Sequence, residues 1–294
     1  MRHILIDTDT GSDDVWAIIA ALRATEDVHV DAITVVCGNV PLEICVKNAL
    51  IATEVADTYF PPVYSGMSRP IVKEKLFSAD YVHGSDGLGE MNLPYPAHQP
   101  EKQHAVDALV EHIMASDGEL ELITLGPLTN VAIALTKYPE LKQLLHSIAL
   151  MGGAAVGGNV TPAAEFNIYD DPDAAQIVFK SGVPLVMCGL DVTMQAELRP
   201  ADWDEMAAYG NRCGGLVKEL FACAWKTIQT VGLTGVAQHD SCPIMYLAHP
   251  ELFEGQMAGV FVETQAEITL GKTVTDLQSD KKFGKKNALV LLKL

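Results

Sequence analysis

Positively charged residues are scarce in this chain relative to negatively charged ones. The sequence has 20 Lys and Arg against 38 Asp and Glu, which gives a formal net charge of -18. Such a surface repels nucleic-acid phosphates and anionic lipid headgroups. No apolar run reaches the roughly 18 residues that a membrane-spanning helix needs. We therefore expect neither a nucleic acid nor a membrane as a partner. A small uncharged ligand, or one met through a bound cation, fits this composition better.

Cysteines are also few, and their spacing excludes a dense disulfide framework. The six cysteines form no C-x-x-C pair and mostly have apolar neighbours, which predicts buried free thiols rather than disulfides or a zinc site. The chain begins with an apolar strand instead of a basic region followed by the apolar core of a signal peptide. Both observations favour a reducing, cytoplasmic location.

Apolar runs alternate with helical periodicity through the first two-thirds of the chain. This alternation is typical of βαβ units, which build a parallel sheet with right-handed crossovers. The 294 residues are 49% apolar and contain no repeat, low-complexity tract or linker. We therefore predict an α/β fold of the Rossmann-like type, with an open, mostly parallel sheet flanked by helices in a single domain over residues 1–294. The predicted strands are residues 3–6, 28–36, 120–125, 147–151 and 184–188, and the predicted helices are residues 15–22, 41–56, 101–115, 130–135 and 172–181.

The remaining segments have a different texture. Residues 61–100 are rich in Pro and Gly with little periodicity, and a loop of that length usually has a function. Residues 200–209 and 215–231 are predicted to be helical. Residues 256–294 are predicted to form short strands around a solvated basic turn that contains Lys281, Lys282, Lys285 and Lys286.

Every predicted strand of the parallel sheet ends in a polar or glycine-containing turn. Open α/β sheets bind ligands just outside the carboxyl ends of their strands. We therefore expect the acidic turn at residues 7–14, Asn39, the glycine-rich residues 152–159 and Asp191 to converge on one pocket.

The acidic turn is the densest cluster of charge in the sequence. Asp7, Asp9, Asp13 and Asp14 lie within eight residues, between a predicted strand and a predicted helix. Like charges at this spacing repel one another and raise one another's pKa, so a hard divalent cation is the simplest way to neutralise them. Capping of the helix accounts for Asp13 and Asp14 but not for Asp7 or Asp9.

Two other acidic motifs compete for this stretch. An EF-hand loop is excluded, because Ser12 and Ile18 occupy the positions that need Gly and Glu. A metal-dependent phosphohydrolase that uses Asp7 and Asp9 stays open, since residues 7–10 resemble the nucleophile loop of haloacid-dehalogenase-type phosphatases. That family has a later acidic pair, and the nearest one here, Asp170-Asp171, is predicted to cap a helix.

Residues 152–159 match neither G-x-G-x-x-G nor a P-loop, because Asn159 stands where a lysine is needed. A phosphate cradle is the lesser alternative here. Glu165, Phe166 and Asn167 follow, and a carboxylate beside an amide suits neighbouring sugar hydroxyls.

Taken together, these stretches resemble the nucleoside hydrolase family of the inosine-uridine type. The matching motifs occur in one order, from about residue 3 to about residue 275, and lie at residues 7–14, 36–39, 126–130, 151–153, 158–159, 164–167, 189–191 and 239–240. The resemblance implies a calcium-dependent enzyme that cleaves the N-glycosidic bond of ribonucleosides into ribose and a free base. A homodimer or homotetramer is implied as well.

The resemblance also implies a role for each matching residue. Calcium would be ligated by Asp9, Asp14, Asp240 and the backbone carbonyl of Leu125, with Asp9 also the general base toward a water on the metal. His239 would protonate the leaving base. Ribose and base would be contacted by a larger set of residues, namely Asp13, Asn39, His83, Asn159, Glu165, Phe166 and Asn167.

The same residues support this chemistry on general grounds. Cleavage of a ribosidic bond passes through an oxocarbenium-like state, so water must be activated on one face and the leaving group stabilised on the other. A non-catalytic nucleoside or ribose binder is the third hypothesis.

Two departures from the family pattern leave questions open. Pyrimidine-preferring relatives carry Gln and Tyr where this chain has Thr227 and Val231, so the sequence does not decide base preference. The family usually continues past its last strand into a final helix, whereas this sequence ends at Leu294.

Overall fold

The computed structural model describes residues 1–74, 77–230, 234–278 and 285–294. Nine strands form one sheet in the order β10-β9-β11-β6-β5-β4-β1-β2-β3. The strands of this sheet are β1 Arg2–Thr8, β2 Val28–Val35, β3 Val63–Ser65, β4 Glu121–Thr124, β5 Ser147–Met151, β6 Leu185–Cys188, β9 Glu254–Val262, β10 Thr273–Asp276 and β11 Ala288–Lys293. Strands β7 Glu197–Leu198 and β8 Val236–Ala237 form a separate antiparallel pair.

The predicted α/β class and mostly parallel sheet are confirmed. Strands β3, β2, β1, β4, β5, β6 and β11 pair in parallel with one another, and β9 pairs antiparallel with both β11 and β10. The α-helices are α1 Ser12–Arg23, α2 Leu42–Ala56, α3 Asp80–His83, α4 Ala105–Ala115, α5 Thr129–Lys137, α6 Phe166–Asp170, α7 Pro172–Lys180, α8 Leu190–Thr193, α9 Pro200–Ala208, α10 Arg212–Thr230 and α11 Ser241–Ala248, and short 3-10 turns lie at Pro139–Gln143, Pro250–Leu252 and Glu267–Thr269.

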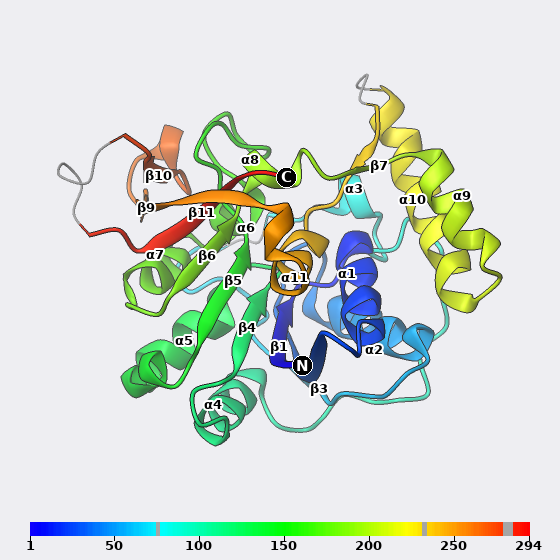
Figure 1. Cartoon of the computed structure of the whole chain (residues 1–294), viewed down its shortest axis with the longest axis horizontal. Coiled ribbons are helices and arrows are strands. Elements are labelled where there is room, and N and C mark those ends of the chain that lie inside the picture. The colour runs from blue at the N-terminus through cyan, green and yellow to red at the C-terminus, as the bar shows by residue number, and fades with distance from the viewer. Residues whose placement is uncertain (75–76, 231–233, 279–284) are drawn as a thin grey trace.

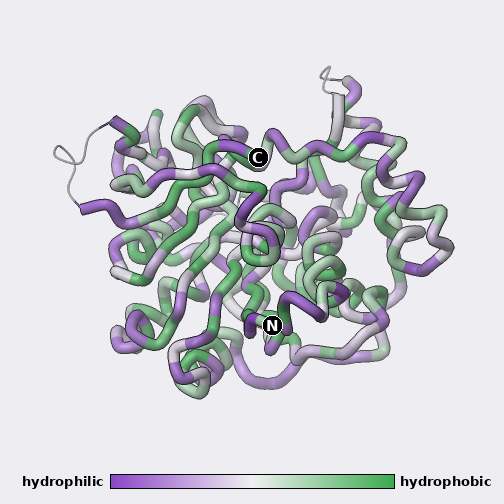
Figure 2. Tube along the Cα trace, in the orientation of Figure 1, coloured by the Kyte–Doolittle hydropathy of each residue, from purple (hydrophilic) through white to green (hydrophobic). Residues whose placement is uncertain are grey.

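Helices cover both faces of the sheet, which explains why its strands are continuously apolar. Successive side chains of a strand point to opposite faces. In β1, Ile4 and Ile6 pack with α1 and α2, whereas Leu5 packs with α4, α5 and α7. Figure 2 shows hydrophobic residues along the central strands and hydrophilic residues mainly on the outer turns.

A further helical part lies at one side of this three-layered body. Helices α9 and α10 stand at one side of the molecule, away from the strands (Figure 1). They enclose a small aromatic core with Trp203 and Phe221, against which Trp16 of α1 and Trp225 pack.

Several predicted boundaries were wrong, each for a local reason. Helix α1 begins at Ser12 rather than at residue 15, because the first turn of a helix tolerates acidic residues well. The segment 61–100 is not without regular structure: it contains β3, which pairs with β2 through Ile33 and Val63, and α3. Three residues at a sheet edge are too few to give a recognisable pattern.

The predicted cap at Asp171 is confirmed, since its Oδ1 accepts the Ala174 N–H at 3.0 Å. Lys281 and Lys282 of the predicted basic turn lie outside the described residues. The other two lysines of this turn, Lys285 and Lys286, are exposed. Among the described residues, no helix combines the length and apolarity needed to cross a bilayer.

Candidate active site

The candidate site lies where the order of the sheet reverses. From β1 the chain proceeds to β2 and β3 on one side, and β4, β5 and β6 follow on the other side. The connections after β1 and β4 therefore leave in opposite directions, which opens a crevice between the carboxyl ends of these two strands. Asp9 follows β1 and Leu125 follows β4, so the sequence places both at this crevice.

Asp7 does not belong to the acidic turn, contrary to the sequence-based prediction. It is a fully buried residue of β1. Its Oδ1 accepts hydrogen bonds from Thr34 Oγ1 at 2.6 Å and Asn130 Nδ2 at 2.9 Å, which join β1 to β2 and α5. Burial raises the pKa of Asp7 to about 7 against the opposing effect of these two bonds. An enclosed carboxyl of this kind is a poor candidate for the nucleophile that the phosphohydrolase alternative requires.

Asp9 is buried and has one free oxygen. Its Oδ2 accepts the Asn39 N–H at 2.8 Å, whereas its Oδ1 has no hydrogen-bond partner among the described residues. The carboxylate is enclosed by two glycines, Gly38 and Gly126, and a Cβ at either position would overlap it. These glycines are therefore required for the close approach of the backbone to Asp9.

Asp14 organises the turn before α1. Its Oδ1 accepts the hydroxyl of Thr8, and its Oδ2 accepts the Gly11 N–H at 2.8 Å and the Asn39 amide at 3.2 Å. The helix-capping explanation thus holds in part for Asp14. The same bonds fix the orientation of its carboxylate beside Asp9.

Three carboxylates lie close enough to hold one cation. Ligand atoms of Asp13, Asp14 and Asp240 lie within 4.8 Å of one another. The expected ligand set contained Asp9 and the Leu125 carbonyl instead of Asp13. Asp9 is nonetheless a near neighbour of this group. Its charge raises the pKa of Asp240, and the charges of Asp14 and Asp13 raise the pKa of Asp9.

Burial is the main cause of the raised pKa values in this cluster. It raises the pKa of Asp9 and Asp240 well above the usual range and that of Asp14 to about 7, and the mutual repulsion of the carboxylates adds to the effect. Within the described part of the chain, neither Asp9 Oδ1 nor Asp13 Oδ1 has a hydrogen-bond partner, although both oxygens are buried. An all-oxygen, strongly negative donor set with unpaired buried oxygens fits a hard cation such as calcium.

Glu165 and Asn167 lie at the start of α6. Glu165 Oε2 accepts the Gly153 N–H at 2.8 Å, and its Oε1 accepts the Asn167 N–H at 3.0 Å. Burial raises the pKa of Glu165 to about 7. Asn167 Nδ2 donates to the Leu125 carbonyl at 2.7 Å, so one hydrogen bond connects a predicted sugar-binding residue to a predicted metal ligand.

Asn159 and Phe166 are held together but differ in exposure. Asn159 is exposed, and its Oδ1 accepts the Phe166 N–H at 3.0 Å. The Phe166 ring is buried and lies 6.2 Å from the ring of Phe77, measured between centroids. Phe77 belongs to the segment after residue 61 and was not among the predicted site residues.

The two candidate histidines are both anchored through Nδ1. His83 Nδ1 lies 2.8 Å from Ser12 Oγ and 3.3 Å from the Ser12 N–H. His239 Nδ1 lies 2.8 Å from Thr193 Oγ1. Burial lowers the pKa of both rings, and the charge of Asp13 opposes this effect in each.

The expectation that Asp191 lines the same pocket is not met by its contacts. Its carboxylate accepts the N–H groups of Ala155 at 2.6 Å and Val156 at 3.1 Å. Asp191 therefore holds the glycine-rich loop, and those two amides are already used. This loop is consequently a poor phosphate cradle.

Ser12, Asn130 and Thr193 were not predicted as contributors to the site. The hydroxyl partners of His83 and His239 lie 71 and 46 positions away in the sequence, so no local pattern could identify them. Asn130 belongs to a matching motif, but its bond to Asp7 depends on the packing of α5. The base-preference positions Thr227 and Val231 cannot be placed, since the side chain of Thr227 and all of Val231 lie outside the described residues.

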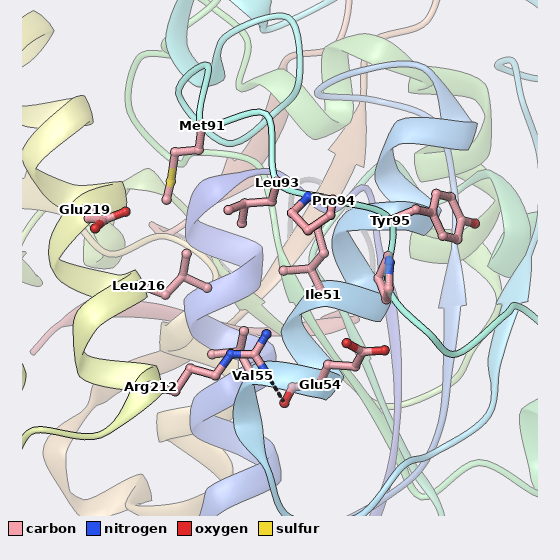
Figure 3. Close-up of a pocket in the computed structure, with 11 residues that line it drawn as sticks. Ile51, Glu54, Val55, Met91, Leu93, Pro94, Tyr95, Arg212, Leu216 and Glu219 are labelled. Carbon is pink, nitrogen blue, oxygen red and sulfur yellow. Dashed lines mark hydrogen bonds between the residues drawn. The ribbon is translucent and has the colours of Figure 1, made fainter.

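A cavity of about 230 Å³ lies elsewhere, between α2, α10 and the segment 91–96 (Figure 3). Its lining includes the apolar side chains of Ile51, Val55 and Leu216. The hydrogen bond drawn there joins Arg212 to the Glu54 carbonyl at 3.5 Å. It contains none of the predicted site residues.

Comparison with known proteins gives a consistent result. The family model described as inosine-uridine preferring nucleoside hydrolase matches residues 4–294. The chain is 43% identical over 277 residues to the pyrimidine-specific ribonucleoside hydrolase RihA of Shewanella sp. strain MR-7, covering 94% of this chain and 86% of that protein. Identity to RihA of Escherichia coli strain SMS-3-5 is 42%, covering 93% and 88%. The solved structure of a purine-preferring ribonucleoside hydrolase from Gardnerella vaginalis superposes with a TM-score of 0.92 at 31% identity, covering 99% of this chain and 93% of that one.

Proposed function

This chain belongs to the inosine-uridine preferring nucleoside hydrolase family and is a ribonucleoside hydrolase, and we propose that it cleaves the N-glycosidic bond in a calcium-dependent reaction. The products would be ribose and a free base. The observation that carries this proposal is the buried Oδ1 of Asp9, which has no partner among the residues described and lies near the carboxylates of Asp13, Asp14 and Asp240.

The metal site would comprise the side chains of Asp9, Asp14 and Asp240 with the carbonyl of Leu125, and Asp13 would lie at its border with the sugar. A bound calcium would offset the repulsion between the carboxylates, lower the pKa of water and hold two sugar hydroxyls. Support comes from the raised pKa values of the three aspartates, which mark a site that lacks compensating positive charge.

Asp9 would act as the general base. Its Oδ2 is fixed by the Asn39 N–H, which leaves Oδ1 available to take a proton from the water that attacks C1′. Burial raises the pKa of Asp9, and a higher pKa makes a carboxylate a stronger base.

The ribose would be held by hydrogen bonds from several strand ends. Asn39, Glu165 and Asn167 are buried and fixed by backbone contacts, so they would meet the hydroxyls in a preorganised arrangement. Asp13, Asn159 and Phe166 would complete the sugar pocket.

The leaving base would lie near His239 and His83. As the bond between C1′ and the base nitrogen breaks, its electron pair goes to the base, and a proton from His239 would neutralise the charge that develops. His83 would contact the base from α3. Pyrimidine ribonucleosides are the preferred substrates in this proposal, which the 43% identity to a pyrimidine-specific relative supports.

A panel of nucleosides tests the proposal directly. Purified protein is assayed for release of reducing sugar from uridine, cytidine, inosine and adenosine, with added calcium and with a chelator. We expect release from uridine and cytidine that stops with the chelator and returns with calcium. Asp9→Asn should lower kcat at least about a hundredfold. Turnover that survives exhaustive chelation would remove the calcium part, and no release from any nucleoside would refute the reaction itself.

A reducing, cytoplasmic setting and a homodimer or homotetramer form the remaining part of the proposal. All six cysteines are free and five are buried, which suits a reducing compartment. Light scattering of the purified protein measures the number of subunits.

A further inference from the structure

Thr193 contacts one of the two histidines at the site through its side chain. It is the last residue of α8 and has no exposed surface. Its Oγ1 lies 2.8 Å from Nδ1 of His239, and this is the only hydrogen bond of that hydroxyl among the described residues. Burial of a polar group is costly when the group is unpaired. The bond to His239 is therefore what compensates for the burial of this hydroxyl.

The position of this hydroxyl is fixed by the backbone around it. Helix α8 begins directly after β6, and the Leu190 N–H donates to the Gly153 carbonyl at 2.9 Å. The Thr193 N–H donates to the Gly189 carbonyl at 3.1 Å. Because Thr193 is β-branched and fully buried, its side chain has few rotamers available. The hydroxyl therefore presents a rigid partner to the imidazole.

We propose that Thr193 is a positioning residue for His239, whose imidazole it holds through Nδ1 so that Nε2 is directed at the leaving base. This inference rests on the proposed function, because the orientation of His239 matters only if His239 protonates the leaving base. His239 directly precedes Asp240, one of the clustered carboxylates, and the charges of Asp13 and His83 act on its ring, so His239 lies near the candidate site.

A hydroxyl is well suited to this task. It can donate to a ring nitrogen that lacks a proton and accept from one that carries a proton. When His239 gives its Nε2 proton to the base, Nδ1 keeps its own proton and donates it to Thr193 Oγ1, so this bond persists while the bond to C1′ breaks. The Ser12 contact of His83 differs, since the Ser12 N–H can only donate to Nδ1.

Thr193→Val tests this inference, because valine keeps the shape and removes the hydroxyl. We expect kcat for uridine to fall at least about tenfold with KM changed less than about threefold, since misorientation affects the reacting geometry more than binding. Activity on 4-nitrophenyl β-D-ribofuranoside should be nearly unchanged, because 4-nitrophenolate leaves without needing a proton. Thr193→Ser should restore most of the activity on uridine.

Thr53→Val is the matched control. Thr53 is a buried threonine of α2 whose hydroxyl donates to the Leu50 carbonyl in its own helix, and its loss should leave both substrates unaffected. If Thr193→Val gives no folded protein, Thr193→Cys makes the same test with a weaker hydrogen-bonding group of similar size.

The outcomes separate this inference from the proposed function. Equal losses of Thr193→Val on both substrates, or no loss on uridine, would overturn the positioning role. His239→Ala should show the same substrate dependence with a larger loss on uridine. If His239→Ala shows it and Thr193→Val does not, the role of His239 stands and the inference about Thr193 fails. If wild-type protein cleaves the activated riboside but no nucleoside, the proposed function fails instead.

Discussion

At the scale of single residues, the most unusual feature is a group of acids that folding buries beside one another. Asp9, Asp14 and Asp240 are all nearly inaccessible, and the charges of Asp9 and Asp14 both raise the pKa of Asp240. Burial of like charges is unfavourable, so these side chains reduce the stability of the metal-free protein. A bound cation would offset that cost, which connects function to stability at this site.

Removal of one carboxylate should therefore separate metal binding from folding. In Asp240→Asn we expect a midpoint of thermal unfolding, without calcium at pH 8, that is equal to or higher than in the wild type. For the wild type, calcium at a hundred times its Kd adds about 2.7 kcal/mol of stability. The variant should lose most of this gain, as measured by differential scanning calorimetry.

Asp107→Asn is the matched control for this charge change. Asp107 is on the surface of α4 and pairs with Lys137, far from the cluster in sequence and fold. It should keep the full response to calcium. An Asp240→Asn variant with the same calcium response as the wild type would contradict the proposed ligand set.

The sequence identified the acids of this site but not the residues that orient them. Asp9 and Asp14 stand out because they follow an apolar strand in a dense motif. Thr8, Asn39 and the glycines at 38 and 126 fix the two carboxylates through contacts across the fold. Such contacts depend on how strands are ordered in the sheet, which a single sequence does not reveal.

At the scale of elements, a strap connects the neighbourhood of Asn39 to the helices α6 and α7. It consists of the described residues 71–74 and 77–79 and is tied to the junction of α6 and α7. The N–H of Ile71 donates to Asp171 Oδ2 at 2.8 Å and the N–H of Phe77 to Asp170 Oδ1 at 3.0 Å. At its other end, the Ala79 N–H donates to the Asn39 carbonyl at 3.0 Å. The strap thereby positions α3 and its histidine relative to Asn39, one of the proposed sugar-binding residues.

The carboxyl that holds Phe77 of this strap should make the stability of the folded protein depend on pH. Burial raises the pKa of Asp170 to about 6 from 3.8, although the Phe77 N–H and Lys73 oppose the shift. The folded protein therefore binds this proton more tightly than the unfolded chain does. This term lowers stability as pH rises from about 4 to about 6, by up to about 3 kcal/mol.

Asp170→Asn should remove that dependence and keep an acceptor for the Phe77 N–H. We expect chemical denaturation to show a smaller loss of stability between pH 4 and pH 6 in the variant than in the wild type. Asp107→Asn again serves as the surface control and should follow the wild-type profile. A wild-type slope retained in Asp170→Asn would show that other groups cause it.

Elements with strong periodicity were predictable, and short elements defined by their neighbours were not. Strand β5 has the predicted bounds, and α2 and α7 are within one residue of them. Strand β3 is recognisable only because β2 lies beside it, and the antiparallel pairing of β9 depends on β11. Tertiary contacts decide such segments, and local propensity has little influence on them.

At the scale of the whole molecule, two differently built parts share one chain. The sheet has helices on both faces, while α9 and α10 enclose an aromatic core at one side. Trp16 of α1 packs against this core, and α10 also contacts α2. From these contacts we expect one cooperative unit, and the single domain over residues 1–294 stays a prediction.

Unfolding followed by two signals tests this cooperativity. The three tryptophans Trp16, Trp203 and Trp225 all lie in or against the aromatic core, so their fluorescence reports on α9 and α10. Far-ultraviolet circular dichroism reports on all helices. We expect coincident denaturation curves. Earlier loss of the fluorescence signal would mean that α9 and α10 unfold separately.

The position of β11 in the sheet has a consequence for how the protein is made. Residues Ala288–Lys293 insert between β6 and β9, so the two antiparallel strands reach the sheet only through a strand that is translated after them. During synthesis, β9 and β10 cannot join the sheet until this segment has left the ribosome. Until then the edge of β6 is open to pairing with another nascent chain, so the interval between the emergence of β6 and that of β11 is a period of exposure to misassembly.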